Sequence, residues 1–131
     1  MQYWLIKTEP NTFSWQEQKQ NGVEHWDGVR NYQARNYMKL MKIGDMVLFY
    51  HSGDERQVMG IVEVVKEFYP DTDENFVCVD VKTHSELKTP VSLKAIKNNH
   101  KLQEIPLVKQ SRLSVMPLRK EDYEEILKMS Q

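Results

Sequence analysis

Runs of apolar residues separated by turn-forming residues predict a β-rich chain. The near-continuous apolar run Asp45–His51 has the length of a strand covered on both faces. A later run contains Gly60, which predicts a bulge, and Val77, Val79 and Val81 alternate with more polar residues, as in a half-buried strand. The predicted strands are Tyr3–Lys7, Asp45–His51, Gln57–Tyr69, Phe76–Lys82 and Arg112–Met116, the last stopped by Pro117.

Helical spacing and capping residues predict several short helices. The clearest is Asn31–Met41, in which Ala34, Tyr37 and Met38 fall on one face and Gly44 follows as a stop signal. The predicted helices are Phe13–Gln20 with Ser14 as N-cap, Asn31–Met41, a helix capped by Ser92 and running through Lys97, Pro106–Gln110 and Lys120–Met129. Long neighbouring strands joined by short turns favour an α+β fold with a strongly bent antiparallel sheet or barrel of about five or six strands.

Length and composition fit a single domain spanning residues 1–131. Hydrophobic residues make up 40% and charged residues 28%, which is enough for a core and excludes a disordered chain. The net charge is −1, yet Asp54–Glu86 contains nine acids and three bases, whereas Lys88–Lys120 contains eight bases and one acid. A polyanion could therefore meet one basic side of the molecule; the alternative is a solvated surface with uneven charge.

The single cysteine, Cys78, rules out an internal disulfide, and its strand-like neighbours indicate a packing residue. Residues Met1–Lys7 lack the basic region and long apolar stretch of a secretory signal. No apolar run approaches the roughly 20 residues needed to cross a bilayer. We expect a cytoplasmic, monomeric protein that is not attached to a membrane.

The sequence contains no motif typical of an enzyme or a cofactor site. Its five glycines form neither a phosphate loop nor a dinucleotide-binding fingerprint, and its four histidines lie far apart, which argues against a metal site. The run from His51 to Asp54 resembles part of a hydrolase triad. However, consecutive strand residues point to opposite faces, so His51 is poorly placed as a base for Ser52. We therefore expect no catalytic residue, metal or cofactor.

The residues that follow Trp26 place aromatic, basic and amide side chains at the start of a helix. Trp26 and Tyr32 can stack on a flat ligand, and Asn31 can read hydrogen-bond donors and acceptors. Arg30 or Arg35 can hold a phosphate. The alternative, which composition alone favours, is that Trp26 belongs to the core and the arginines to the surface.

Short segments along nearly the whole chain resemble the EVE domain family of the PUA-like superfamily, in order and without large gaps. Such a series is far more specific than a lone motif. The chain is lean, so it resembles a free-standing, bacterial-type member. The segments are Tyr3–Pro10, Trp26–Asn36, Gly44-Asp45, Phe49–Ser52, Gly60–Val62, Tyr69–Asp71, Pro90–Leu93 and Arg112–Pro117.

This resemblance implies a PUA-like fold, a bent β-barrel flanked by helices, and a non-catalytic role. Family members are implicated in binding modified bases, particularly C5-methyl- or hydroxymethylcytosine in DNA, and modified RNA. The expected partner is therefore nucleic acid. The candidate residues of a base-binding pocket are Trp26 and Tyr50 as walls, Val29 at the modification, and Asn31, Tyr32, His51, Ser52 and Ser114. The candidate phosphate ligands are Lys7, Arg30, Arg35 and Arg112.

Several alternatives stay open. The ligand could be RNA rather than DNA. The domain could be a small enzyme acting on nucleotides, for which His51 is the only obvious base. A protein-interaction module would instead expose an apolar patch as its main surface feature. Among the candidate residues, Tyr50 and Val29 could be plain core, and Trp4 is expected in the core because it lies in a buried first strand.

Overall fold

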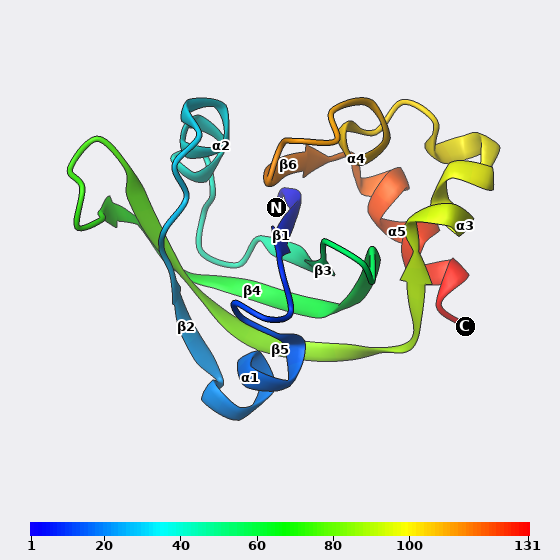
Figure 1. The fold of residues 1–131 in the computed structure, drawn as a ribbon, viewed down its shortest axis with the longest axis horizontal. Coiled ribbons are helices and arrows are strands. Elements are labelled where there is room, and N and C mark those ends of the chain that lie inside the picture. Colours follow the sequence, from blue (N-terminus) through cyan, green and yellow to red (C-terminus); the bar gives the residue numbers. More distant parts are fainter.

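Six strands form one mixed sheet through the middle of the molecule (Figure 1). In the computed structural model, which describes residues 1–131, the strand order is β2-β5-β4-β3-β1-β6. The strands are β1 Tyr3–Thr8, β2 Val23–Trp26, β3 Met46–His51, β4 Gln57–Pro70, β5 Val77–Ser92 and β6 Val115–Leu118. This is the α+β architecture predicted from the sequence.

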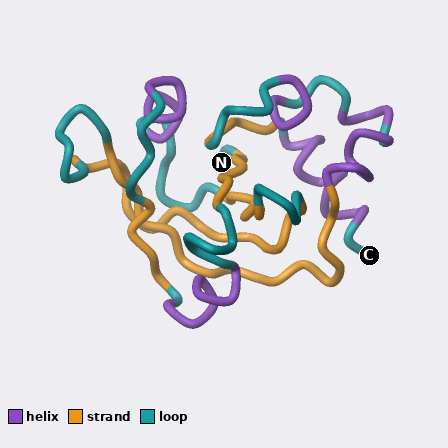
Figure 2. Tube along the Cα trace, in the orientation of Figure 1, coloured by secondary structure: helices purple, strands orange, loops and turns teal.

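Short helices lie around the sheet rather than within it (Figure 2). They are α1 Trp15–Asn21, α2 Tyr32–Met38, α3 Leu93–Asn98, α4 Pro106–Lys109 and α5 Lys120–Met129, with a 3₁₀ turn at His100–Leu102. α1 contacts β2, α2 contacts β5 and β6, and α3 and α5 contact β5. None of these helices combines the length and the hydrophobicity of a membrane-spanning helix.

One strand pair departs from the expected antiparallel pattern. β1 pairs with β3 in parallel, while it pairs with β6 in the antiparallel sense. Parallel strands need a long connection, and residues 9–45, which contain α1, β2 and α2, supply it. The antiparallel prediction was drawn from the short turns that join β3, β4 and β5, and it is confirmed for those strands.

The long strands β4 and β5 curve across the whole molecule (Figure 1). Their register shifts between Val58 and Gly60, so the predicted bulge at Gly60 is confirmed. A Cβ added at Gly60 would overlap the benzo ring of Trp15. The absence of a side chain at Gly60 therefore lets the first turn of α1 pack directly on the sheet.

Phe49 lies at the centre of an aromatic cluster within the core. Its side chain is fully buried on β3, and its ring lies 5.1 Å from that of Trp15, 5.6 Å from Trp26 and 6.2 Å from Phe13. Trp4 on β1 is also buried, as predicted. Because aromatic pairs have preferred tilted geometries, this cluster fixes the positions of α1 and of the end of β2 relative to β3.

Several element boundaries differ from the sequence prediction. β2 was not predicted, because its exposed residues alternate with only one buried side chain, Trp26. Residues 77–81 are buried on both faces, whereas their alternating pattern predicted a half-buried strand. β6 contains Pro117, which was expected to stop it; β6 is an edge strand, where proline costs no outer hydrogen bond.

Candidate functional site

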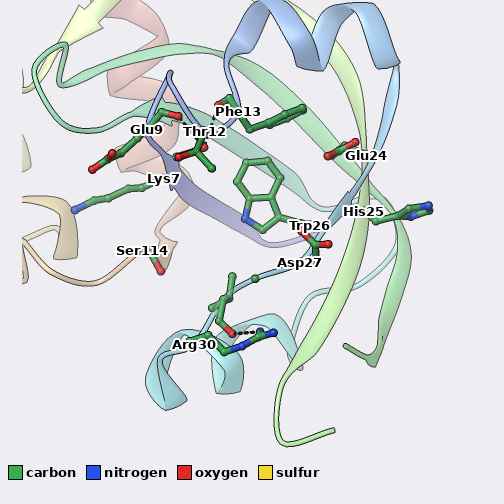
Figure 3. A pocket seen from close by; sticks show the side chains of 13 residues that line it. Lys7, Glu9, Thr12, Phe13, Glu24, His25, Trp26, Asp27, Arg30 and Ser114 are labelled. Atoms are coloured by element: carbon green, nitrogen blue, oxygen red, sulfur yellow. Dashed lines mark hydrogen bonds between the residues drawn. The ribbon is translucent and has the colours of Figure 1, made fainter. Parts of the chain in front are cut away.

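A cavity of about 300 Å³ opens between the end of β1, the segment that follows β2, and the residue before β6 (Figure 3). This volume is at the lower end of the range of small-molecule sites, roughly 300–1,000 Å³. The lining residues are Lys7, Thr8, Glu9, Thr12, Phe13, Glu24, His25, Trp26, Asp27, Gly28, Val29, Arg30 and Ser114. Residues far apart in the sequence thus meet because β1 lies beside β6 and is linked through residues 9–14 to α1.

Trp26 lies in the middle of the cavity wall (Figure 3). Its side chain is only 7% exposed, and its ring packs edge-on against Phe49 and Phe13 at interplanar angles of 82° and 78°. The indole therefore has one fixed orientation. It belongs both to the core and to the cavity, so the two interpretations of Trp26 drawn from the sequence are not exclusive.

The indole N–H of Trp26 makes no hydrogen bond within the protein and is not buried. By contrast, the N–H of Trp4 donates to Asp45 at 3.0 Å and that of Trp15 donates to Glu86 at 3.1 Å. Among the three tryptophans, Trp26 alone offers a free donor, and it offers that donor to the cavity.

Two carboxylates and two hydroxyls of the cavity wall are also uncommitted. The side chains of Glu9 and Asp27 accept no hydrogen bond from the protein, and those of Thr12 and Ser114 make none. Val29 adds an apolar side chain to the wall. The cavity can therefore hold a ligand that has donors, acceptors and a small apolar group.

Lys7 marks one edge of the cavity. Its ammonium donates to the carbonyl oxygen of Ser111 at 2.9 Å and lies 5.8 Å from the centre of the Tyr50 ring. Burial lowers the pKa of Lys7 from its ordinary value. An ammonium has three protons, so two remain available for a ligand.

Asp71 holds the opposite rim of the cavity in place. Its Oδ2 accepts hydrogen bonds from the backbone N–H of Gly28 and from Nη1 of Arg30, both at 2.9 Å. Burial alone would raise the pKa of Asp71, but the hydrogen bonds from Arg30, Gly28 and Thr72 outweigh it and hold the pKa well below its ordinary value. Arg30 lines the cavity but is engaged by Asp71 and by the ring of Phe76, 5.1 Å away.

Tyr32 and Arg35 lie outside the cavity lining. The ring of Tyr32 stacks on that of Phe76 with a centroid distance of 5.1 Å. The guanidinium of Arg35 lies 4.8 Å from the centre of the same Tyr32 ring. Arg35 also bonds to Asn36 and to the carbonyl of Asn75. These contacts attach the start of α2 to the turn between β4 and β5.

Asn31 and Tyr50 are likewise used by the fold. The Asn31 side chain is the N-cap of α2 and accepts from the N–H of Ala34 at 2.9 Å. Tyr50 is 2% exposed, and burial raises its pKa to about 12. Ser52 lies in a neighbouring hollow with Glu9, and Arg112 in another hollow with Asn31.

His51 is buried and committed on both ring nitrogens. Its Nε2 accepts the backbone N–H of Trp15 at 2.9 Å, so the proton of the neutral ring is on Nδ1, which donates to Glu55 at 2.8 Å. This donated hydrogen bond is the main reason why the pKa of Glu55 is lowered. His51 does not line the cavity and has no free nitrogen for a substrate.

The family of this chain follows from its sequence similarity to known proteins. The sequence profile of the EVE domain family matches residues 2–129. This chain belongs to the EVE domain family. It is 32% identical to thymocyte nuclear protein 1 of Gallus gallus over 98% of this chain and 69% of that protein.

Several solved structures superpose closely on this one, in agreement with the predicted PUA-like fold. A protein from Agrobacterium tumefaciens is 47% identical with a TM-score of 0.97, covering 99% of this chain and 93% of its own. The human THYN1 protein in complex with 5-methylcytosine-containing DNA is 30% identical with a TM-score of 0.95, covering 100% and 98%. An ASCH protein from Zymomonas mobilis, 12% identical with a TM-score of 0.60, shares the fold alone.

The cavity of this EVE domain brings together five of the residues singled out in the sequence. These are Lys7, Trp26, Val29, Arg30 and Ser114, whereas Asn31, Tyr32, Arg35, Tyr50, His51, Ser52 and Arg112 lie outside its lining. Sequence reasoning missed Glu9, Thr12, Phe13 and Asp27. Glu9 could have been included, because it lies in the Tyr3–Pro10 segment that resembles the family. No sequence feature pointed to Thr12, because only the fold of residues 9–14 brings it to the cavity.

His25, another missed residue, lies at the outer edge of the cavity on β2. Its Nδ1 lies 2.8 Å from the largely buried carboxylate of Asp80, which also accepts the hydroxyl proton of Tyr69. The hydrogen bond to Asp80 is the largest cause that raises the pKa of His25. This group links the edge strand β2 to β4 and β5.

Proposed function

We propose that this EVE domain is a non-catalytic nucleic-acid binding module that reads a modified base, C5-methyl- or hydroxymethylcytosine in DNA or a modified base in RNA, in the cavity beside Trp26. The observation that carries the proposal is the rigid indole, whose free N–H faces a cavity with uncommitted carboxylates and hydroxyls. The similarity to the human protein solved with 5-methylcytosine-containing DNA supports this ligand class.

The polar groups of the cavity suit cytosine better than thymine. Cytosine carries an exocyclic amine, and carboxylates are the side chains that accept hydrogen bonds from it. Glu9 and Asp27 are free to do so. The same carboxylates repel a phosphate, so the base rather than the backbone of a nucleic acid fits this cavity.

The energy available from a methyl group limits the expected preference. Removing a base from a duplex costs a few kcal/mol, and contact with an aromatic ring returns at most about 1–3 kcal/mol. A methyl group that contacts Val29 adds about 0.8 kcal/mol, or roughly fourfold in affinity. A larger preference for hydroxymethylcytosine requires a partner for its hydroxyl, and Ser114 and Thr12 line the cavity with free hydroxyls.

The enzyme alternative rested on His51, and the two hydrogen bonds of its buried ring leave it no role as a base. His25, the one histidine in the lining, is paired with Asp80, so no histidine of the cavity is free to act as a base. We therefore favour binding without turnover.

A titration with matched single-stranded oligonucleotides at one low salt concentration tests the proposal. The strands carry cytosine, 5-methylcytosine, hydroxymethylcytosine or thymine at one position, as DNA and as RNA. Thymine has the same methyl group as 5-methylcytosine but no exocyclic amine, so it separates the two recognition elements. We expect 5-methylcytosine to bind a few-fold more tightly than both cytosine and thymine.

Variants of the lining residues test whether the preference for the modified base arises in the cavity. Val29→Ala should remove the preference for the methyl group, and Trp26→Phe, which keeps an aromatic ring but lacks the N–H, should weaken binding of every strand. Val23→Ala, an exposed substitution on β2 outside the cavity, is the matched control and should change nothing. Equal affinities for all strands would rule out modified-base reading for these ligands and would favour a protein-interaction module.

A further inference from the structure

A second hollow of about 320 Å³ lies beside the cavity, between the start of α2 and the loop that precedes β6. We call it the amide groove. The residues that matter for its chemistry are Gln33 on α2 and Lys109, Gln110, Ser111 and Arg112 on the loop side. The groove is next to the cavity because Ser111 bonds to Lys7 and Ser114 lines the cavity itself.

The charges around the cavity are strongly asymmetric. The amide groove contains two cationic side chains and no carboxylate. By contrast, the hollow that shares Glu9 with the cavity contains Asp54 and Glu55. A polyanion that enters the cavity is therefore repelled on the Glu9 side and attracted on the groove side.

The groove also has uncommitted hydrogen-bonding groups. Arg112 is exposed and its guanidinium makes no hydrogen bond or ion pair with the protein, and the side-chain amides of Gln33 and Gln110 are exposed and unbonded. Lys109 is less available because it lies 3.3 Å from Glu104. Lys7 stands at the boundary between groove and cavity, with two ammonium protons free.

We propose that the amide groove binds the nucleotide adjacent to the one whose base occupies the cavity. Arg112 holds the phosphate of this neighbour, and Lys7 contacts the phosphate that links the two nucleotides. Gln33 and Gln110 contact the edge of the neighbouring base, because an amide both donates and accepts, as base edges do. This rests on the proposed function and adds a ligand of at least two unpaired nucleotides, with a sequence preference on one side of the modified base.

The phosphate contact is tested by Arg112→Ala against Lys97→Ala. Lys97 is also an exposed cation, but it lines a different hollow that shares no residue with the cavity or the amide groove, so both variants lose one charge. With a modified single strand, Arg112→Ala should weaken binding about three- to tenfold and reduce the magnitude of the slope of log K against log salt by about 0.7, the value for one phosphate on a single strand. Equal effects of the two variants would overturn the proposal.

The base contact is tested with strands in which all four bases occupy each position beside the modified cytosine. We expect the wild-type protein to prefer one base on one side by a few-fold, and Gln33→Ala combined with Gln110→Ala to abolish this preference. Gln16→Ala, an exposed substitution on α1, serves as the control and should keep it. If the wild-type protein shows no preference on either side, the groove does not read a base.

The two proposals fail in different ways. The ratio of affinities for modified and unmodified strands reports on the cavity, and the groove variants should leave this ratio unchanged. If modified and unmodified strands bind equally while Arg112→Ala still weakens binding, the cavity does not read a modified base. The groove proposal then fails as well, because it assumes a modified base in the cavity. If the ratio is maintained and Arg112→Ala has no effect, only the groove proposal fails.

Discussion

Trp26 is a residue that serves the core and the cavity at once, and this limits how it can be substituted. Its ring contacts Phe49 and Phe13 and is 7% exposed. Trp26→Ala should therefore cost about 3–5 kcal/mol of stability, because it leaves a void beside Phe49 and Phe13, while Trp26→Phe should cost much less. Urea denaturation of both variants measures this. A cost below about 1 kcal/mol for the alanine variant would show that the packing of Trp26 is dispensable.

His25 should make the stability of the domain depend on pH. Its folded pKa is raised above the ordinary value of 6.5, mainly by its hydrogen bond to Asp80. A raised pKa stabilises the folded state below the unfolded pKa, and this stabilisation is lost as the pH rises through the folded pKa. Asp80, whose pKa is lowered, stays charged in this range.

We therefore expect the melting temperature to decrease from about pH 6 to pH 8, and His25→Gln to flatten this decrease. A thermal melt at a series of pH values measures it. His84→Gln removes an exposed histidine on β5 that bonds only to its neighbour Ser85, and it should leave the pH dependence unchanged. The same slope in both variants would exclude His25 as its source.

Several candidate residues show why residue-level prediction from sequence is limited. The sequence places Asn31 and Tyr50 in segments that resemble the family. It does not show that the Asn31 side chain caps α2 or that Tyr50 is buried by neighbouring elements. A side chain's direction depends on tertiary packing, which a single sequence does not encode locally. The sequence did place Lys7, Trp26 and Val29, which line the cavity, among the candidates, because they lie in segments that resemble the EVE domain family.

At the scale of elements, the contact between α1 and the β4 bulge depends on Gly60. Because a Cβ there would overlap the Trp15 ring, Gly60→Ala should cost about 1–3 kcal/mol or more from overpacking. Chemical denaturation measures this cost. Trp15→Phe combined with Gly60→Ala should recover part of it, since the smaller ring vacates the contact, and strictly additive losses would contradict this explanation.

The rim of the cavity depends on the turn between β4 and β5 through Asp71. Asp71→Ala removes the acceptor for Gly28 and Arg30, which should cost about 1–3 kcal/mol and increase hydrogen exchange at the amides of residues 27–30. Exchange followed by mass spectrometry or NMR checks this. Glu74→Ala changes an exposed acid of the same turn and should leave exchange at the rim unchanged; equal protection in both variants would contradict the role of Asp71.

Most elements could be predicted because their signals are local. The helix capped by Ser14 has the capping box with Glu17, and the C-terminal helix has the predicted limits Lys120–Met129. β2 was missed because an edge strand with exposed side chains carries little hydrophobic pattern. The parallel pairing of β1 with β3 was missed because it depends on a connection of three intervening elements, not on a turn.

At the scale of the whole molecule, a net charge of −1 predicts weak non-specific attraction to nucleic acid. The cations available beside the cavity are few, chiefly Lys7 and Arg112, since Lys109 is paired with Glu104. Two or three phosphate contacts should give a slope of log K against log salt of about −1.4 to −2 on single strands. Titrations at four or more salt concentrations measure it, and a much steeper slope would indicate a larger basic surface than this one.

The free indole N–H of Trp26 has a practical consequence. Trp4 and Trp15 are buried and bonded to carboxylates, so their fluorescence should form a constant background, whereas a base that contacts Trp26 should quench or shift its emission. The unlabelled wild-type chain thus contains an optical reporter of cavity occupancy. The Trp26→Phe variant supplies the spectrum of the background alone.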